Sequence, residues 1–222
     1  DRENFLQKMV NHMDHIAIHS LLEDFTNETR KPVITFLEDN HASEIFLANV
    51  SNNVMKTRKL FIYLASMIAL AEIDSPLLSA FEDIDKMTEL YNLALTTESS
   101  LLSGQIFALL TRLTDQIEIE EDGHDEENED PLYESVVKLG IAKLEDVFNF
   151  LKNDTPFSQN KERAVKLILS VLMHNSSVPE CVFDYAAHLF SQMFENPTHS
   201  IMHTAFLSIF DVLLAETELF EK

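Results

Sequence analysis

Apolar residues recur every three or four positions along almost the whole chain, and this helical period limits the fold more than any other feature. The alternation of apolar and polar residues that is typical of half-buried strands is almost absent. Only three of the 222 residues are glycine, too few for the many tight turns of a sheet protein. Each of the six prolines comes where a helix should start or stop. We therefore expect an all-α protein.

Polar residues and prolines at the breaks in this period divide the chain into helices. The segment Lys59–Leu70 is apolar almost all the way round, which is typical of a helix that is covered on both sides. This favours stacked layers over a simple two-layer bundle. The expected helices span residues 3–13, 15–27, 32–39, 42–51, 54–73, 76–82, 84–96, 99–117, 132–139, 141–153, 159–174, 178–195 and 198–217.

The connections between these helices are short, so consecutive helices should be antiparallel neighbours. Helix pairs recur at intervals of roughly 35 to 45 residues, which is the range of HEAT and armadillo repeats. We expect a single domain over residues 1–222, an armadillo-like α-solenoid of stacked antiparallel helical hairpins, with an irregular helical bundle as the alternative. The sequence starts without Met and stops on a helical pattern, so we expect it to be a fragment of a longer protein.

One segment belongs to none of the helix pairs. Nine of the thirteen residues from Glu118 to Asp130 are acidic and none is basic. Self-repulsion and the lack of apolar anchors predict a disordered acidic loop over residues 118–131, between two halves of the solenoid. The loop either keeps the protein soluble or attracts a binding partner, which would be a basic protein or a divalent ion.

The charge balance excludes whole classes of partner. Lys and Arg total 16 against 38 Asp and Glu, so the formal net charge is −22. Such a chain repels phosphate backbones and anionic lipid headgroups, which argues against nucleic acid and membrane surfaces as partners. No window approaches the roughly 18 consecutive apolar residues of a spanning helix, and the acidic start cannot open a signal peptide. We expect a cytoplasmic or nuclear protein.

No set of residues suggests catalysis. His15 with His19, and His199 with His203, have the i, i+4 spacing of zinc proteases, but neither pair has the Glu after its first His or a third ligand. We favour packing or interface histidines over a metal site. Cys181 lies in an apolar helix without a neighbouring base, which favours a buried structural thiol over a nucleophile. We expect no enzyme activity, no cofactor and no metal.

Basic residues are scarce, and two groups of them stand at the start of helices. Lys56, Arg58 and Lys59 begin one helix, and Lys161, Arg163 and Lys166 begin another. Each group covers a broad face of the first turns. These residues are either ordinary solvated charges with salt bridges between repeats, or a docking patch for an acidic partner surface.

Four sets of segments share an ordered pattern. They are Phe5–Met13 with Ile18–Leu22, Val33–Leu37 with Ile45–Leu47, Pro156–Ile168, and Met193–His203, spread over the chain from residue 5 to residue 203. In this order they resemble the SAPS family, the regulatory subunits of protein phosphatase 6. That family has a Pro-apolar-Gly-x-Asn-Arg stretch before an aliphatic helix, and an aromatic pair followed by Pro, Asn-type residues and a closing His. Earlier in the chain it has a helix pair that ends in His and an aliphatic helix pair.

The chain departs from the family pattern at four positions, which makes it a remote member. Ser158 replaces the glycine, Lys161 the arginine, Phe36 the tryptophan and Ser20 the aspartate. Lys161 keeps the positive charge but loses the planar fork with which arginine binds two acceptors.

The resemblance implies a non-catalytic regulatory or scaffold subunit. It would bind a protein phosphatase 2A-like (PP2A-like) Ser/Thr phosphatase catalytic subunit of the protein phosphatase 6 type, and direct it to substrates or to further regulatory subunits. The alternative is a helical-repeat adaptor in an unrelated assembly such as trafficking machinery. The residues that we expect to contact the partner are Asn160, Lys161, Arg163, Lys166, Phe194, His203, Lys56 and Arg58.

Overall fold

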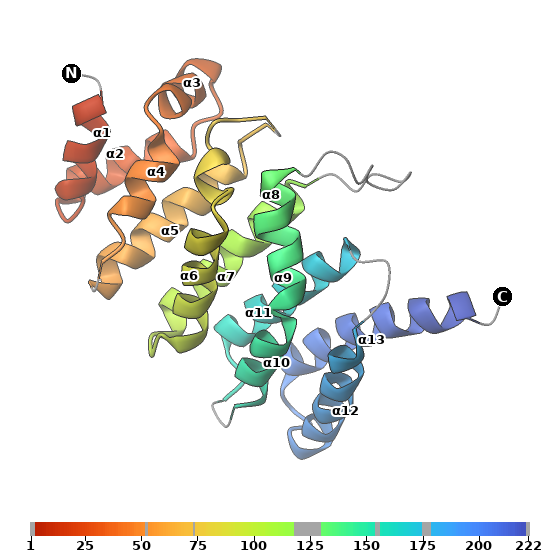
Figure 1. The fold of residues 1–222 in the computed structure, drawn as a ribbon. Coiled ribbons are helices and arrows are strands. Elements are labelled where there is room, and N and C mark those ends of the chain that lie inside the picture. The colour runs from red at the N-terminus through yellow and green to blue at the C-terminus, as the bar shows by residue number, and fades with distance from the viewer. Residues whose placement is uncertain are drawn as a thin grey trace.

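A computed structural model describes residues 3–51, 53–72, 74–117, 130–153, 156–174 and 179–220. Every regular element in these ranges is a helix, which confirms the all-α prediction (Figure 1). Most of the expected acidic loop, residues 118–129, lies outside the described residues, and Pro131 already begins a helix.

In the described ranges, the expected helices other than 76–82 begin within three residues of their predicted starts. Two expected boundaries are wrong: α5 ends at Ile68 and not at residue 73, and the break expected at Gly140 lies at Lys143. Gly140 stays inside the helix, where it packs closely against Val171 of α11. The chain from Pro131 to Ala142 is one run of helix whose middle, η2, has π-helical geometry. The bounds are α1 Glu3–Asn11, α2 Ile16–Thr26, α3 Lys31–Asp39, α4 Ala42–Ala48, α5 Val54–Ile68, η1 Ser79–Phe81, α6 Ile84–Thr96, α7 Ser100–Asp115, α8 Pro131–Tyr133, η2 Glu134–Lys138, α9 Leu139–Ala142, α10 Leu144–Lys152, α11 Gln159–Met173, α12 Glu180–Glu195 and α13 Ser200–Phe220.

Side-chain caps fix several helix starts. Asn53 accepts a hydrogen bond from the backbone N–H of Lys56 at the start of α5, and Ser99 accepts one from Leu102 at the start of α7. Asp83 accepts two such bonds at the start of α6. Each cap satisfies backbone donors that have no partner inside the helix. The helix starts that the sequence predicted for α5, α6 and α7 are therefore confirmed.

The helix expected over residues 76–82 is wrong. This segment forms turns and the short 3₁₀ helix η1. Its side chains at Leu77, Leu78, Ala80 and Phe81 are all buried, while Ser79 is exposed. These four positions would span only about 160° of an α-helix, so the apolar pattern itself fits one. The backbone instead forms the tighter bonds of a 3₁₀ helix, from Leu78 N–H to the Ser75 carbonyl and from Phe81 N–H to the Leu78 carbonyl. The Ser79 hydroxyl also donates to the carbonyl of Pro76, and such local side-chain bonds compete with α-helix formation.

The helices are arranged in two rows that run the length of the molecule (Figure 1). In the first row α2 contacts α5, α5 contacts α7, α7 contacts α11 and α11 contacts α13. In the second row α4, η1, α6, the η2–α10 segment and α12 contact one another in the same order. Helices α4, α6, α10 and α12 each also contact a helix of the first row. Each helix therefore meets mainly its neighbours along the stack.

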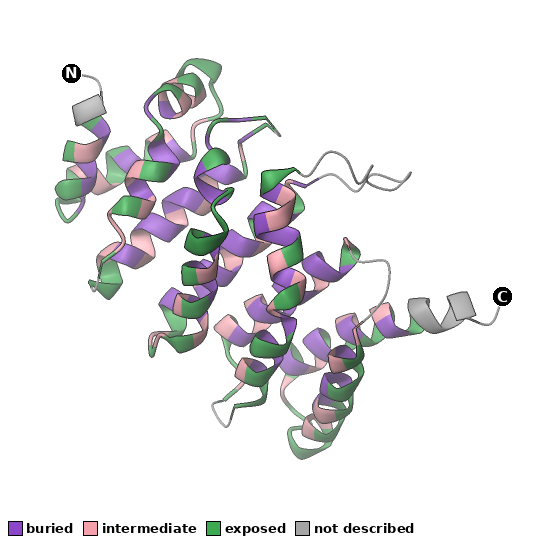
Figure 2. Cartoon of the chain, viewed as in Figure 1, coloured by how far each residue is buried: buried purple, intermediate pink, exposed green. Residues whose placement is uncertain are grey.

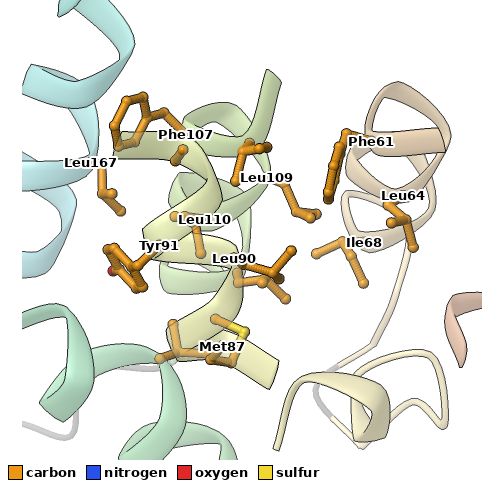
Figure 3. Close-up of a cluster of buried hydrophobic side chains, with 14 of the residues drawn as sticks. Phe61, Leu64, Ile68, Met87, Leu90, Tyr91, Phe107, Leu109, Leu110 and Leu167 are labelled. Carbon is orange, nitrogen blue, oxygen red and sulfur yellow. The ribbon is translucent and has the colours of Figure 1, made fainter. Parts of the chain in front are cut away.

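One continuous core fills the space between the rows. Phe61 and Ile68 of α5, Leu90 of α6 and Leu109 of α7 converge in it, and Leu167 of α11 extends it along the stack (Figure 3). Buried residues line the inward faces of both rows, and exposed residues gather on the outer faces and connections (Figure 2). Helix α5 lies between α2 and α7, which accounts for its largely apolar sequence.

Candidate partner-binding surface

Two arginines from different helices come close together at one edge of the first row. Arg58 and Arg163 are each the fifth residue of their helix, α5 and α11, and Gly104 is the fifth residue of α7 between them. The Cδ atom of Arg163 lies 3.5 Å from the position that a Cβ on Gly104 would take. The Arg163 stem therefore lies directly over this point of α7.

The positive charge of this pair is only partly compensated. Burial lowers the pKa of the Arg163 guanidinium, the carboxylate of Glu162 opposes this shift, and the like charge of Arg58 adds to it. The Nε atom of Arg58 is buried and donates no hydrogen bond within the described part of the chain. Glu162 instead forms an ion pair of 2.8 Å with the exposed Lys166. The edge therefore keeps net positive charge that an acidic group could neutralise.

We define the basic ridge as Arg58 of α5 with Arg163 and Lys166 of α11. All three side chains are exposed or half-buried. Lys56, predicted to belong with them, is half-buried and lies two residues before Arg58, hence about 200° around the helix.

Asn160 shapes the first turn of α11. Its Cα lies 3.4 Å from the position that a Cβ on Gly104 would take, so it forms the contact between α11 and α7. Its side-chain oxygen accepts hydrogen bonds from the backbone N–H of Lys161 at 3.0 Å and from the hydroxyl of Ser158 at 2.6 Å. Asn160 thus positions the helix that carries Arg163.

Lys161 is not a surface residue, and its predicted exposed position is wrong. Its side chain is 3 % exposed, and its Nζ donates hydrogen bonds to the carbonyls of Leu151 at 3.1 Å and Asn153 at 2.9 Å. These carbonyls end α10, where a cation interacts favourably with the helix dipole. The sequence carried a signal for this, because Lys161 shares its helical stripe with the buried Ala164 and Ile168.

A cleft of about 400 Å³ lies beside Lys161, between the ends of α10 and α12 and the start of α13. His199 lines this cleft. Its Nδ1 accepts a hydrogen bond from the backbone N–H of Met202, so the ring proton is on Nε2. Nε2 lies 3.0 Å from the carbonyl oxygen of Phe157, to which it donates. Both Lys161 and His199 thus bind backbone groups. The hydrogen bond from His199 to Phe157 links the start of α13 to the segment that precedes α11.

Phe194 and His203 lie beyond this cleft, on the last hairpin. The Phe194 side chain is 73 % exposed, and its ring meets that of Phe190 edge-on with centroids 5.0 Å apart. His203 Nε2 lies 3.0 Å from the carbonyl oxygen of Asn196. Of the predicted contact residues, Arg58, Arg163 and Lys166 therefore lie on the basic ridge, and Phe194 and His203 lie on the α12–α13 hairpin. The others, Lys56, Asn160 and Lys161, belong to neither surface.

The histidine pairs and the cysteine have other partners or surroundings. His19 hydrogen-bonds to the hydroxyl of Tyr63, while His15 is exposed before α2. In the ranges that the structure describes, no three or more His, Cys, Asp and Glu side chains gather as a possible metal site. Burial raises the pKa of the half-buried Cys181 thiol, and the charge of Glu145 adds to this. A raised pKa is the opposite of what a nucleophilic thiol needs.

None of the helices in the described ranges has the length and hydropathy needed to cross a bilayer. Comparison of the chain with protein-family models, with curated proteins and with solved structures finds no match.

Proposed function

We propose that this chain is an armadillo-like α-solenoid that serves as a scaffold for protein binding. The two rows support this, because each helix contacts its neighbours along the stack and the rows grow in chain order. A solenoid of this kind offers long outer surfaces whose affinity depends on a few anchors.

The partner that we propose is a PP2A-like Ser/Thr phosphatase catalytic subunit, which the scaffold would direct to its substrates. The segment that resembles the SAPS family, Pro156–Ile168, forms the start of α11 and supplies Arg163 to the basic ridge. The placement of the Arg163 stem over Gly104 of α7 is the observation that carries the proposal. The charge of Arg58 acts on the same guanidinium and lowers its pKa.

The ridge is the kind of site that an acidic protein surface recognises. A chain of net charge −22 repels acidic partners at long range, so a local group of cations is needed to bind one. Arginine is suited to this because its planar guanidinium binds a carboxylate through two hydrogen bonds. An acidic loop of the catalytic subunit placed over Gly104 would meet both arginines.

Charge reversal tests the proposal. The double variant Arg58→Glu/Arg163→Glu should bind purified PP2A-like catalytic subunit at least about 10-fold more weakly, since like charges then face each other. The matched control is Arg112→Glu, which reverses an exposed cation near the other end of α7. Titration calorimetry gives the Kd, and far-UV circular dichroism checks that each variant remains helical.

Two results would overturn this reading. If no PP2A-like catalytic subunit binds the unaltered chain, the phosphatase assignment is wrong and an unrelated adaptor role replaces it. If the catalytic subunit binds but the double variant and Arg112→Glu behave alike, the basic ridge is ordinary solvated surface.

A further inference from the structure

The last hairpin carries a strip of exposed apolar side chains. Phe183, Phe190 and Phe194 fall on one stripe of α12, and Leu207 and Phe210 fall on one stripe of α13. Their side chains are between 40 % and 73 % exposed, which is unusual for five large hydrophobic residues in two neighbouring helices. We call these five residues the aromatic strip.

Ring contacts make the strip continuous across the two helices. Phe190 lies 5.0 Å from Phe194 and 5.8 Å from Phe206 of α13, measured between ring centroids. Phe206 in turn stacks on Phe210 at 5.6 Å. The strip lies on the sides of α12 and α13 that are turned away from α10 and α11, the helices against which this hairpin is placed.

Acidic side chains border the strip on both sides. Asp184 and Glu195 are exposed along its outer edge on α12, and Asp211 is exposed along its outer edge on α13. The sequence from residue 167 to residue 221 contains no Lys and no Arg. An apolar strip between two acidic edges is complementary to a helix with an apolar face and basic flanks.

We propose that the aromatic strip is a docking site for an amphipathic helix of another protein, with Lys or Arg on both sides of its apolar face. A second copy of this chain fits poorly, because its own strip would bring acidic edges against acidic edges. The occupant differs in charge from the partner of the basic ridge, so this site does not depend on the function proposed above.

A synthetic peptide of about 18 residues, five helical turns, tests the proposal. It carries Leu and Phe on one face, Lys on both flanks and a single Trp in the apolar face. The chain itself has no Trp, so the emission of the peptide reports its burial directly. A second peptide replaces every Lys by Glu and leaves the apolar face unchanged.

The Lys peptide should bind with a blue shift of its Trp emission, and the Glu peptide should bind at least about 10-fold more weakly. The double variant Phe194→Ala/Leu207→Ala should weaken binding of the Lys peptide by about 10-fold or more. Leu101→Ala is the matched control, since Leu101 is an exposed apolar residue of α7 outside the strip. Arg58→Glu/Arg163→Glu should leave peptide binding unchanged, which separates this site from the basic ridge.

Three results would overturn the proposal. The first is that the Lys and Glu peptides bind equally. The second is that the double variant Phe194→Ala/Leu207→Ala binds the Lys peptide as tightly as Leu101→Ala does. The third is that sedimentation shows a dimer of the chain that Phe194→Glu dissociates, because the strip would then be covered by a second copy.

Discussion

Lys161 provides the most direct test of the described structure, because a basic residue at the start of a helix is usually solvated. Here its ammonium group is buried and binds two carbonyl oxygens at the end of α10. Hydrogen bonds to charged groups contribute about 1.5–3 kcal/mol each. Replacing Lys161 by Met keeps the length of the stem but removes both bonds, a loss of about 3–6 kcal/mol. Met also avoids the cost of burying an ammonium group, which offsets part of this loss, so we expect the free energy of unfolding to fall by about 2–4 kcal/mol.

Charge reversal should cost more. Lys161→Glu would place a carboxylate beside two carbonyl oxygens at the negative end of a helix dipole, and we expect a loss of about 3–5 kcal/mol. For a chain of this size that corresponds to a fall in Tm on the order of 10 °C. The control is Lys166→Glu, five residues along the same helix, whose side chain is exposed and forms one ion pair with Glu162. For Lys166→Glu the free energy of unfolding should fall by no more than about 1 kcal/mol.

Urea titration followed by far-UV circular dichroism measures these differences. The reasoning is refuted if Lys161→Glu and Lys166→Glu unfold at the same urea concentration, because the two lysines would then share a solvated environment. A large and equal loss for both variants would refute it in the same way, because the exposed Lys166 would then matter as much as the buried Lys161.

Two further perturbations follow from the packing and the pKa shifts. A Cβ on Gly140 would lie 2.9 Å from Val171 Cγ2, so Gly140→Ala should lower the free energy of unfolding by about 1–3 kcal/mol. A Cβ on Gly104 would lie no closer than 3.4 Å to its neighbours, so Gly104→Ala should raise it by up to about 1 kcal/mol. Thermal melts of the two variants measure both effects. Burial, with the charge of Glu23 in support, raises the pKa of Tyr63 from 10.0 to about 12. The folded state therefore binds the hydroxyl proton of Tyr63 more tightly than the unfolded state does. This contribution to the free energy of unfolding is present below pH 10 and is lost as the pH rises towards 12. Urea titrations across this range should show a smaller decline for Tyr63→Phe, and an equal decline would refute the assignment.

The helices could be read from the sequence because local signals agree with the apolar period. Asp83 and Ser99 each cap a helix at the residue where the period begins, so the starts of α6 and α7 were predictable. The prediction for residues 76–82 failed although the buried side chains follow the helical period, because the backbone there forms 3₁₀ hydrogen bonds. Its path depends on contacts with α4 and α6, which a local reading of the sequence does not contain.

The candidate site was predictable only in part, for a similar reason. The sequence shows that cations begin α5 and α11, but it does not show that the Arg163 stem lies over Gly104 of α7. Lys161 was assigned to the surface because it stands among charged neighbours, although its helical stripe is apolar. Periodicity should therefore outweigh local composition when a charged residue begins an amphipathic helix.

The distribution of charge along the stack limits what one partner can occupy. The basic ridge belongs to α5 and α11, whereas the hairpin of α12 and α13 carries exposed acids beside the aromatic strip. A single partner that covered both surfaces would need an acidic region and a basic helix at the matching separation. Two partners of opposite charge need no such match, and sites without shared residues affect each other little. A scaffold that holds an acidic protein at one surface and a basic helix at the other could therefore exchange either partner without releasing the other.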